Sequence, residues 1–411
     1  MKSIAKLFRT AVFAVATAAL AVAVAFPVTS CRAPAAASQT LLPQALGWAA
    51  VAAGGVHTVA VTAGGQLWAW GFNEFGQLGD GTNESRNLPT RIGSAGNWAS
   101  VAAGTVHTLA VTTDGQLWAW GENERGQLGL GDNENRNEPV RVNLPDGTPA
   151  NWVFVAADGA HSLAITADGQ LWAWGENERG QLGLGDNISR NEPARVGTMS
   201  DWIFAATGDS HSFAITAAGE LWAWGWNNFG QLGDGTWTDR NAPVRIGIGA
   251  ATNWAYVAAG GAHSVAITVE GEIWAWGLNA SGQLGDGTEV MRNAPVPAGA
   301  PAGVAWASVS AGGVYTIAIT TEGEMWGWGN NELGQLADGT TDDRNLPVRV
   351  AQGAGTAAAG TAAARWMAVS ADWAHTAAIT ATGELWLWGH NDFGQLGNGT
   401  WENSYEPTRI N

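Results

Sequence analysis

One thirteen-residue stretch recurs seven times along this chain of 411 residues, and it is clearest as LWAWGENERGQLG at Leu117 to Gly129. The copies follow one another about every fifty residues. A repeat of this length is typical of an array, a solenoid or a propeller, in which each copy forms one supersecondary unit. The second tryptophan marks the copies, at Trp70, Trp120, Trp174, Trp224, Trp276, Trp328 and Trp388.

The residues inside each copy alternate with the two-residue period of a β-strand. The segment HTLAVT places His107, Leu109 and Val111 on one strand face, and QLWAW places both of its tryptophans on one face. Neither face is strongly polar, so we expect these strands to be covered on both sides, as in propeller blades that pack between two neighbours. No apolar 3.6-residue period follows residue 31, so no helices are expected there.

A fixed order of short motifs surrounds the tryptophan-rich stretch. The copies begin with W-x-x-V-A-A-G or a close variant of it, as in Trp98 to Gly104, and five of the seven close with R-N-x-P-x-R-[VI], as in Arg136 to Val142. The other two carry Pro297 in place of the second arginine and Ser404-Tyr405 in place of Arg-Asn. From about Trp48 to Ile410 this order resembles the repeat of the regulator of chromosome condensation family. The resemblance implies an all-β fold, a seven-bladed β-propeller with four-stranded antiparallel blades, here over residues 45–411. It implies little about function, because one fold hosts many unrelated activities.

The first thirty residues have the features of an export signal. Lys2, Lys6 and Arg9 form a basic start, and Ala11 to Phe26 is an uncharged, mostly apolar run of sixteen residues. This run is short for a membrane span and long enough for the apolar core of a signal. We therefore expect residues 1–30 to be a signal peptide and the protein to be an exported, bacterial member of the family.

The residues that follow predict a lipid anchor. Val28 to Cys31 resembles a lipobox, which would be cleaved before Cys31 and lipidated on it. Cys31 is the only cysteine, so a disulfide within the chain is excluded. The alternative is an ordinary signal that is cut later, at Ala35 to Ala37, which would give a secreted protein instead of one anchored in the cell envelope. Residues 31–44 are predicted to be a flexible Ala/Pro-rich tether, and residues 351–364 a low-complexity insert in a surface loop.

The charge of the chain argues against nucleic acid as a partner. After removal of residues 1–30, 16 arginines and no lysine remain against 36 acidic residues, a net charge of −20. A nucleic-acid binder needs a basic patch to neutralise phosphates. We expect contact with the membrane only through the N-terminal lipid anchor. We also expect the protein to be a monomer.

No catalytic, metal or cofactor site is expected. Six histidines occupy one strand position per copy, about fifty residues apart, so they cannot share a metal, and Tyr315 takes this position in the sixth copy. Acidic loops such as Gly131 to Asn135 lack the spacing of a calcium loop, although the sequence alone does not settle calcium binding. No Ser/His/Asp or Cys/His arrangement can be assembled, so the chain is not expected to be an enzyme. The six histidines are His57, His107, His161, His211, His263 and His375.

Four tryptophans exceed the three that every copy carries. Their equivalents in other copies are polar or small: Trp226 replaces a glutamate, Trp237 and Trp401 replace asparagines, and Trp373 replaces a glycine. The fold thus does not require tryptophan there, and exposed aromatic residues are enriched in binding hot spots. The alternative is that these side chains are partly buried within long loops.

The order of the strands predicts that all four lie on one face. If the strands of a copy are called A to D, the A–B turns and the C–D loops emerge at the same end of the blade. Trp373 lies on an A–B turn, and the other three lie on C–D loops. Four phenylalanines of the C–D loops join them in the predicted partner-binding surface: Phe72, Phe75, Phe229 and Phe393.

These observations favour a non-catalytic scaffold that binds a protein partner through one loop face, for example as the inhibitor of an enzyme. Two alternatives come from the resemblance. Nucleotide exchange on a small GTPase requires an intracellular partner, which the export signal argues against. Light sensing, known among plant members, uses Gly-Trp-Arg-His-Thr motifs that only Asp372 to Thr376 approaches here. The sequence does not identify the partner.

Overall fold

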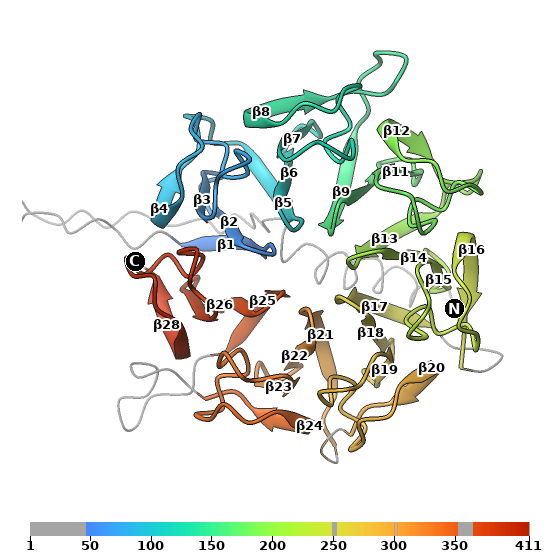
Figure 1. Cartoon of the computed structure of the whole chain (residues 1–411), viewed down its shortest axis with the longest axis vertical. Coiled ribbons are helices and arrows are strands. Elements are labelled where there is room, and N and C mark those ends of the chain that lie inside the picture. The colour runs from blue at the N-terminus through green and yellow to red at the C-terminus, as the bar shows by residue number, and fades with distance from the viewer. Residues whose placement is uncertain (1–46, 249–252, 300, 302, 352–364, 411) are drawn as a thin grey trace, which may run out of the picture.

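The computed structural model describes residues 47–248, 253–299, 301, 303–351 and 365–410. The predicted signal peptide, Cys31, the tether and all of the 351–364 insert except Ala351 lie outside the described residues. Every regular element of the described part is a strand, and the 28 strands form seven separate four-stranded sheets. The predicted fold is confirmed: seven blades surround a central channel (Figure 1).

Each blade contains four consecutive strands, and every neighbouring pair is antiparallel. The innermost strands line the channel and are β1 (Trp48–Ala53), β5 (Trp98–Ala103), β9 (Trp152–Asp158), β13 (Trp202–Thr207), β17 (Trp254–Ala259), β21 (Trp306–Ala311) and β25 (Trp366–Asp372). The second strands are β2 (His57–Thr62), β6 (His107–Thr112), β10 (His161–Thr166), β14 (His211–Thr216), β18 (His263–Thr268), β22 (Tyr315–Thr320) and β26 (His375–Thr380).

The third strands carry the paired tryptophans and are β3 (Leu67–Gly71), β7 (Leu117–Gly121), β11 (Leu171–Gly175), β15 (Leu221–Gly225), β19 (Ile273–Gly277), β23 (Met325–Gly329) and β27 (Leu385–Gly389). The outermost strands are β4 (Arg86–Arg91), β8 (Arg136–Val142), β12 (Arg190–Arg195), β16 (Arg240–Ile246), β20 (Arg292–Pro297), β24 (Arg344–Arg349) and β28 (Ser404–Ile410). Each blade therefore contains one copy as delimited in the sequence, from its W-x-x-V-A-A-G motif or variant to its closing segment.

The hydrophobic core lies between the blades. All six residues of each second strand are buried, which confirms that these strands are covered on both faces. Each core cluster joins two blades; in one, Leu67 and Leu78 of blade 1 pack with Trp98 and Trp120 of blade 2. The stability of one blade therefore depends on its neighbours, as expected for a repeat protein.

Hydrogen bonds between side chains and backbone reinforce each blade junction. The indole nitrogen of Trp120 donates to the carbonyl oxygen of Gln77 in the preceding blade at 2.9 Å, and the hydroxyl of Thr108 donates to the same oxygen at 2.8 Å. Trp70 and Thr58 of blade 1 make the same two bonds to Gln395 of blade 7, both at 2.8 Å. The ring thus closes with the same two contacts, which also join the other blades except blades 5 and 6, where the indole bond is missing among the described residues; no strand is exchanged between the ends of the ring.

The contribution of this indole bond can be measured with a matched pair of variants. Trp174 donates to the carbonyl oxygen of Gln127 at 2.9 Å, whereas the buried indole nitrogen of Trp328 has no partner among the described residues. Trp174→Phe and Trp328→Phe each remove similar packing volume, and we expect each to cost about 2 kcal/mol or more. Because only Trp174→Phe also removes a hydrogen bond, urea unfolding should show an additional loss of about 1 kcal/mol. Equal losses would show that this bond contributes nothing.

Candidate functional site

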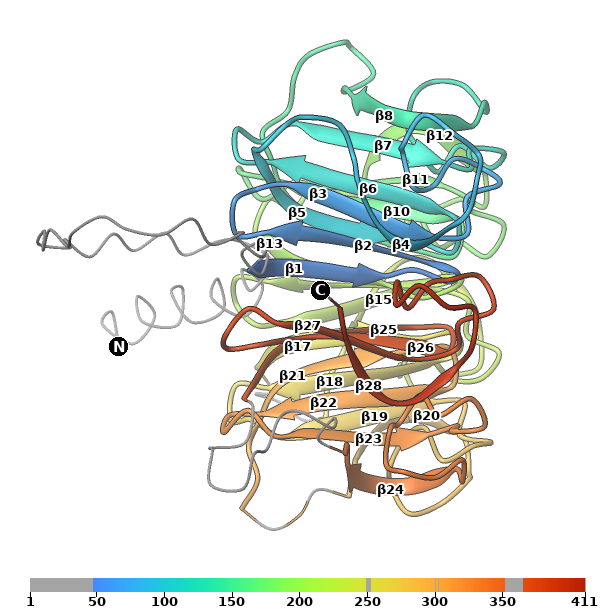
Figure 2. The ribbon, with the colours of Figure 1, turned by 90° about the vertical axis from the view of Figure 1, so that its left-hand side faces the viewer.

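The A–B turns and C–D loops meet at one end of the propeller, which we call the loop face (Figure 2). The backbone joins the two connections directly: the amide of Phe72, which begins a C–D loop, donates to the carbonyl of Val56 in an A–B turn at 3.0 Å. Equivalent bonds occur in the other blades, for example from Trp226 to Ser210 and from His390 to Ala374. The structure therefore confirms the prediction that the A–B turns and the C–D loops lie on the same face.

A buried asparagine holds each C–D loop in shape. In blade 1, the Oδ1 atom of Asn73 accepts the amide of Leu78 at 2.9 Å, and its Nδ2 donates to the carbonyl oxygens of Thr82 and Glu84, both at 3.1 Å. The amide of Phe75 donates to the side chain of Gln77 at 3.1 Å. The asparagine and the glutamine therefore stabilise the conformation of the loop. The positions between them, which differ from copy to copy, are held in a defined arrangement at the surface.

An ion pair closes the same loop. The guanidinium of Arg86 lies 2.9 Å from the Asp80 carboxylate, and the bonds from Thr82 and Arg86 hold the pKa of Asp80 below its usual value despite the opposing effect of burial. Six of the seven blades contain such a pair. In blade 7 both partners change together, since Asn398 and Ser404 stand in the two positions.

An aromatic cluster covers the junction of blades 7 and 1 on the loop face. Phe75 contacts Phe72 with ring centroids 6.1 Å apart, and Phe72 contacts Phe393 of the neighbouring blade at 5.2 Å. His390 continues the series, at 5.8 Å from Phe393 and 5.1 Å from Trp373. Three of the predicted phenylalanines and one of the predicted tryptophans thus form one continuous surface at the ring closure.

Trp226 differs from the other extra tryptophans because it is only partly exposed. Its ring packs edge-on against Phe229 at 5.1 Å, and the guanidinium of Arg179, from the preceding blade, lies 6.0 Å from the ring centroid. The indole nitrogen is buried without a partner in the described part of the chain. Trp226 therefore shows the partial burial that was the alternative for these tryptophans, because a residue of the preceding blade packs on it; its role in binding stays a prediction.

The remaining three extra tryptophans are about half-exposed: 47% for Trp237, 50% for Trp373 and 48% for Trp401. Trp373 also has a backbone φ of +31°, a left-handed value that is unfavourable for a bulky residue. Its amide donates to the Asp372 carboxylate at 2.6 Å, and its carbonyl accepts the amide of Gly313 at 3.1 Å. At the same turn position of blade 3, Gly159 has a φ of +50° without this strain.

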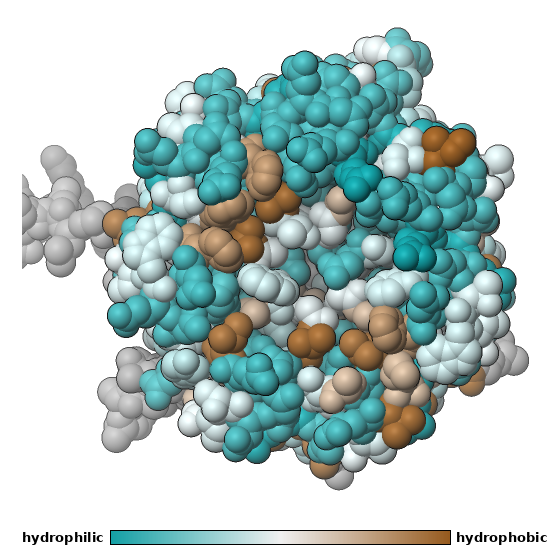
Figure 3. All heavy atoms as spheres, in the orientation of Figure 1, coloured by the Kyte–Doolittle hydropathy of each residue, from teal (hydrophilic) through white to brown (hydrophobic). Residues whose placement is uncertain are grey.

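Side chains at equivalent loop positions divide the face into two sectors. Blades 2 and 3 present Glu122, Arg125, Glu176 and Arg179, whereas the other five blades present mainly apolar groups (Figure 3). Sequence reasoning missed Leu278 and Leu333, which lie at the positions equivalent to Phe72 and Phe75; aligning the copies at those two positions would have found both. We call the partly or half-exposed apolar set the apolar crescent: Phe72, Phe75, Trp226, Phe229, Leu278, Leu333, Trp373 and Phe393.

The repeated histidines are structural. The Nε2 atom of His107 lies 3.0 Å from the hydroxyl of Ser162 in the next blade, and that hydroxyl donates to the carbonyl of Gln127 at 2.8 Å. Because the hydroxyl hydrogen is used, the histidine must donate, which fixes the neutral Nε2–H tautomer. Burial lowers the pKa of His107 to about 3. Tyr315 makes the equivalent contact in blade 6, with its hydroxyl 2.9 Å from that of Thr376.

Metal binding has no support in the described residues, where no group of three His, Cys, Asp or Glu side chains could hold an ion. The same residues contain no helix that is long and apolar enough to cross a bilayer.

Seven repeat blades arranged in a ring, with a partly apolar loop face, define a propeller-type binding module. Known families contain the same repeat. The family model of the RCC1-like domain matches residues 27–205, and that of the regulator of chromosome condensation (RCC1) repeat matches residues 218–267, 270–319, 322–379 and 382–411. The chain belongs to the RCC1-like repeat family, whose propeller is a protein-binding fold.

Several curated proteins are similar to this chain. The mitochondrial RCC1 domain-containing protein RUG3 of Arabidopsis thaliana is 35% identical over 348 residues, which are 84% of this chain and 55% of that protein. The ultraviolet-B receptor UVR8 of the same plant is 33% identical over 142 residues, 34% of this chain and 30% of the receptor. The human E3 ubiquitin-protein ligase HERC2 is 30% identical over 351 residues, 85% of this chain but 5% of the ligase. The chain thus spans about half, or less, of these relatives.

Solved structures agree with the fold. Human WBSCR16 superposes with a TM-score of 0.75 at 26% identity, over 84% of this chain and 94% of that one. Yeast RCC1 (Prp20), from its complex with Kap60, gives a TM-score of 0.72 at 20% identity, over 94% and 91% of the two chains.

Proposed function

We propose that this protein is a non-catalytic scaffold that is exported, anchored by a lipid on Cys31, and binds a protein partner through its loop face. The observation that carries the proposal is the gathering of aromatic side chains on this face at positions where the fold accepts small or polar residues. Trp237 occupies the position of Asn133, and Trp373 that of Gly159. Large apolar groups left half-exposed on a soluble domain are typical of interaction sites.

The arrangement of the face supports a protein as the partner. The apolar crescent extends over five blades, and Trp237 and Trp401 stand at its rim with 47% and 48% of their surface exposed. An interface with an apolar centre and a polar rim has this composition. The charged sector of blades 2 and 3 gives the partner a defined orientation, because like charges across an interface are disfavoured. Inhibition of an enzyme is one form that this binding would take.

The point where the chain enters the propeller supports the proposed anchoring. Trp48, at the start of β1, donates its amide to the carbonyl of Gly383 in the turn between β26 and β27 at 2.9 Å. This turn lies at the end of the blades opposite to the loop face (Figure 2). An anchor that precedes Trp48 in the chain would therefore leave the apolar crescent directed away from the membrane and open to a partner.

Replacement of the lipidated residue tests the anchoring. In the proposed protein, Cys31→Ser abolishes lipid attachment, so the variant should move from the detergent phase to the aqueous phase or accumulate unprocessed. Detergent partitioning of the wild type and the variant, after expression with the complete signal, gives the answer. A variant that stays in the detergent phase to the same extent would disprove the lipobox, and its processing site would show whether Ala35 to Ala37 is used instead.

The rim tryptophans test the binding face. Trp237→Asn and Trp401→Asn introduce the residue found at positions 133 and 187, where the asparagine amide donates to the loop backbone at 2.9 Å. We expect each variant to keep its melting temperature and to lose about 2 kcal/mol or more of affinity, about 30-fold. The partner is first captured from envelope and secreted proteins with the lipid-free domain, and its Kd is then measured by calorimetry. Reduced stability with unchanged Kd would assign these tryptophans to packing.

A further inference from the structure

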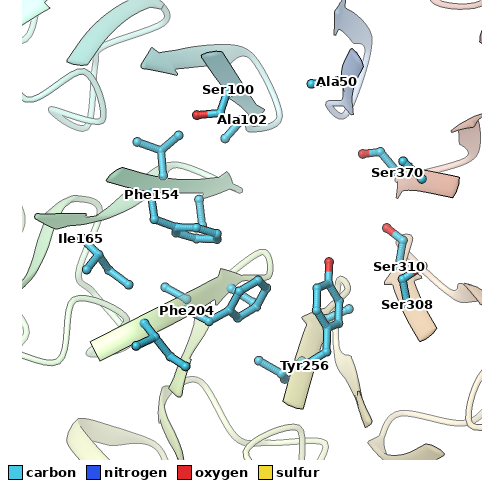
Figure 4. Close-up of a pocket in the computed structure, with 18 of the residues that line it drawn as sticks. Ala50, Ser100, Ala102, Phe154, Ile165, Phe204, Tyr256, Ser308, Ser310 and Ser370 are labelled. Atoms are coloured by element: carbon cyan, nitrogen blue, oxygen red, sulfur yellow. The ribbon is translucent and has the colours of Figure 1, made fainter. Parts of the chain in front are cut away.

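The central channel has one aromatic side, which the fold does not require. The residue two positions after the first tryptophan of each innermost strand points into the channel, and in three consecutive blades it is aromatic: Phe154, Phe204 and Tyr256 (Figure 4). In the other four blades it is small, and these residues leave the opposite side of the channel open. They are Ala50, Ser100, Ser308 and Ala368.

The three rings form a contiguous strip. Phe154 and Phe204 have centroids 4.9 Å apart, and Phe204 and Tyr256 have centroids 4.7 Å apart, with tilted planes in both pairs. Phe204 is 5% exposed because its two neighbours cover it, whereas Phe154 and Tyr256 are partly exposed to the channel. Phe204 thus supports the two outer rings, and those rings present the surface that a bound molecule would meet.

Unused hydrogen-bonding groups lie beside this strip. The hydroxyl of Tyr256 points into the channel in Figure 4, and the described residues supply it with no hydrogen-bond partner. The hydroxyl of Ser308, on the next innermost strand, is buried and also lacks a partner within the described part of the chain. The channel encloses about 2130 Å³, so a molecule has ample room to contact the Tyr256 hydroxyl, whereas the buried Ser308 hydroxyl is not accessible from it.

The channel is strongly acidic. Five carboxylates line it, Asp158, Asp168, Asp201, Glu322 and Asp372, against one guanidinium, Arg365, which pairs with Glu322 at 3.4 Å. Asp158 and Asp372 lie at the loop-face end, and no cation pairs with either of them among the described residues. Burial, reinforced by the neighbouring aspartates, raises the pKa of both carboxyls, so a bound cation would relieve an existing repulsion.

We propose that the channel binds a small organic cation with a flat, apolar body, held against Phe154 and Tyr256 with its charge directed toward Asp158 and Asp372. Aromatic faces attract cations through their quadrupole, and a passage lined by carboxylates concentrates positive ligands. Neutral flat molecules lack both of these attractions, and anions are repelled by the channel. This site is separate from the apolar crescent and does not depend on the proposed protein partner.

A matched pair of probes tests the proposal with the whole folded domain. N-methylquinolinium carries a fixed positive charge on the same bicyclic body as quinoline, which is neutral at pH 8. We expect calorimetry to show saturable binding of one N-methylquinolinium per chain and at least tenfold weaker binding of quinoline. Equal binding of the two probes, or no saturable binding, would overturn the proposal.

Variants locate the binding. Tyr256→Ser and Phe154→Ser introduce the serine that blades 2 and 6 carry at this position, and each should weaken the binding of N-methylquinolinium at least tenfold. Asp372→Asn removes a charge without removing an aromatic surface, and it should weaken the binding about threefold or more. Leu88→Glu, on the outer strand β4 where other blades carry Glu138 and Glu192, adds negative charge outside the channel and should change nothing. Unchanged affinity in all three channel variants would show nonspecific attraction to an acidic surface and would overturn the site.

Discussion

The propeller is expected to unfold in mild acid, with a midpoint near pH 5, because six buried histidines resist protonation. Burial lowers their pKa from 6.5 to about 3, or to about 4 for His263. Folding favours the neutral form, so the unfolded chain binds protons below pH 6.5 while the folded chain does not. Stability is therefore complete above pH 6.5 and is lost as the pH falls from 6.5 toward 3.

The size of the effect follows from the number of histidines. At pH 5 each unfolded histidine is protonated with a free-energy gain of about 2 kcal/mol, so six of them contribute about 12 kcal/mol. This matches the entire stability of a typical domain, about 5–15 kcal/mol. Five carboxyls act in the opposite direction, because burial raises their pKa and acidification therefore favours the folded state there: Glu122, Asp158, Glu176, Asp209 and Asp372. These carboxyls reduce the loss of stability that the six histidines cause in acid.

Circular dichroism during acid titration measures the midpoint, and one variant provides the control. His263 contacts the hydroxyl of Thr316 at 3.0 Å, and the natural Tyr315 contacts that of Thr376 at 2.9 Å, so His263→Tyr copies an arrangement already present in the ring. The variant should take up one proton fewer on unfolding and retain about 2 kcal/mol more of its stability at pH 5. A fold that is stable down to pH 3.5 would contradict the assignment of the neutral, buried tautomer.

The sequence predicted the fold well because seven copies reveal which positions must be constant. A tryptophan such as Trp70 recurs because it fills the space between blades and donates across the junction, and Asn73 recurs because its amide organises the loop. Comparison of the copies also identified Trp237, Trp373 and Trp401 as residues that the fold does not demand. Their half-exposed state and shared face are observed in the structure; their role in binding stays a prediction.

Other features depend on contacts between blades, which a single copy does not contain. Trp226 is partly covered by Arg179 from the preceding blade, so comparison of the copies could not decide between exposure and partial burial for this residue. Sequence comparison missed the aromatic strip of Phe154, Phe204 and Tyr256. The alternating pattern defines two faces of the innermost strand, but it does not identify which of them lines the channel of the assembled ring. Leu278 and Leu333 were missed for a different reason, because only aromatic residues were compared among the loops.

Trp373 should show the clearest separation of binding from stability. Its left-handed backbone costs about 1–2 kcal/mol for a residue other than glycine, and nothing in the fold demands a side chain there, since Gly159 forms the same turn in blade 3. We therefore expect Trp373→Gly to change the free energy of unfolding by less than about 1 kcal/mol, because relief of strain offsets the lost packing on His390 and the greater entropy of unfolded glycine. Affinity for the protein partner should fall at least 30-fold, the effect of removing a tryptophan hot spot.

Trp373→Ala distinguishes the ring from the backbone. Alanine removes the indole but keeps a Cβ atom in the left-handed region, so this variant should be less stable than Trp373→Gly by about 1 kcal/mol while binding the partner equally weakly. Urea unfolding and calorimetric titration of both variants provide the two measurements. A loss of several kcal/mol of stability in Trp373→Gly, together with an unchanged Kd, would mean that the tryptophan packs the ring closure. A binding role instead explains why a strained backbone is retained at Trp373. Its indole is half-exposed on the loop face, beside the aromatic cluster of blades 7 and 1.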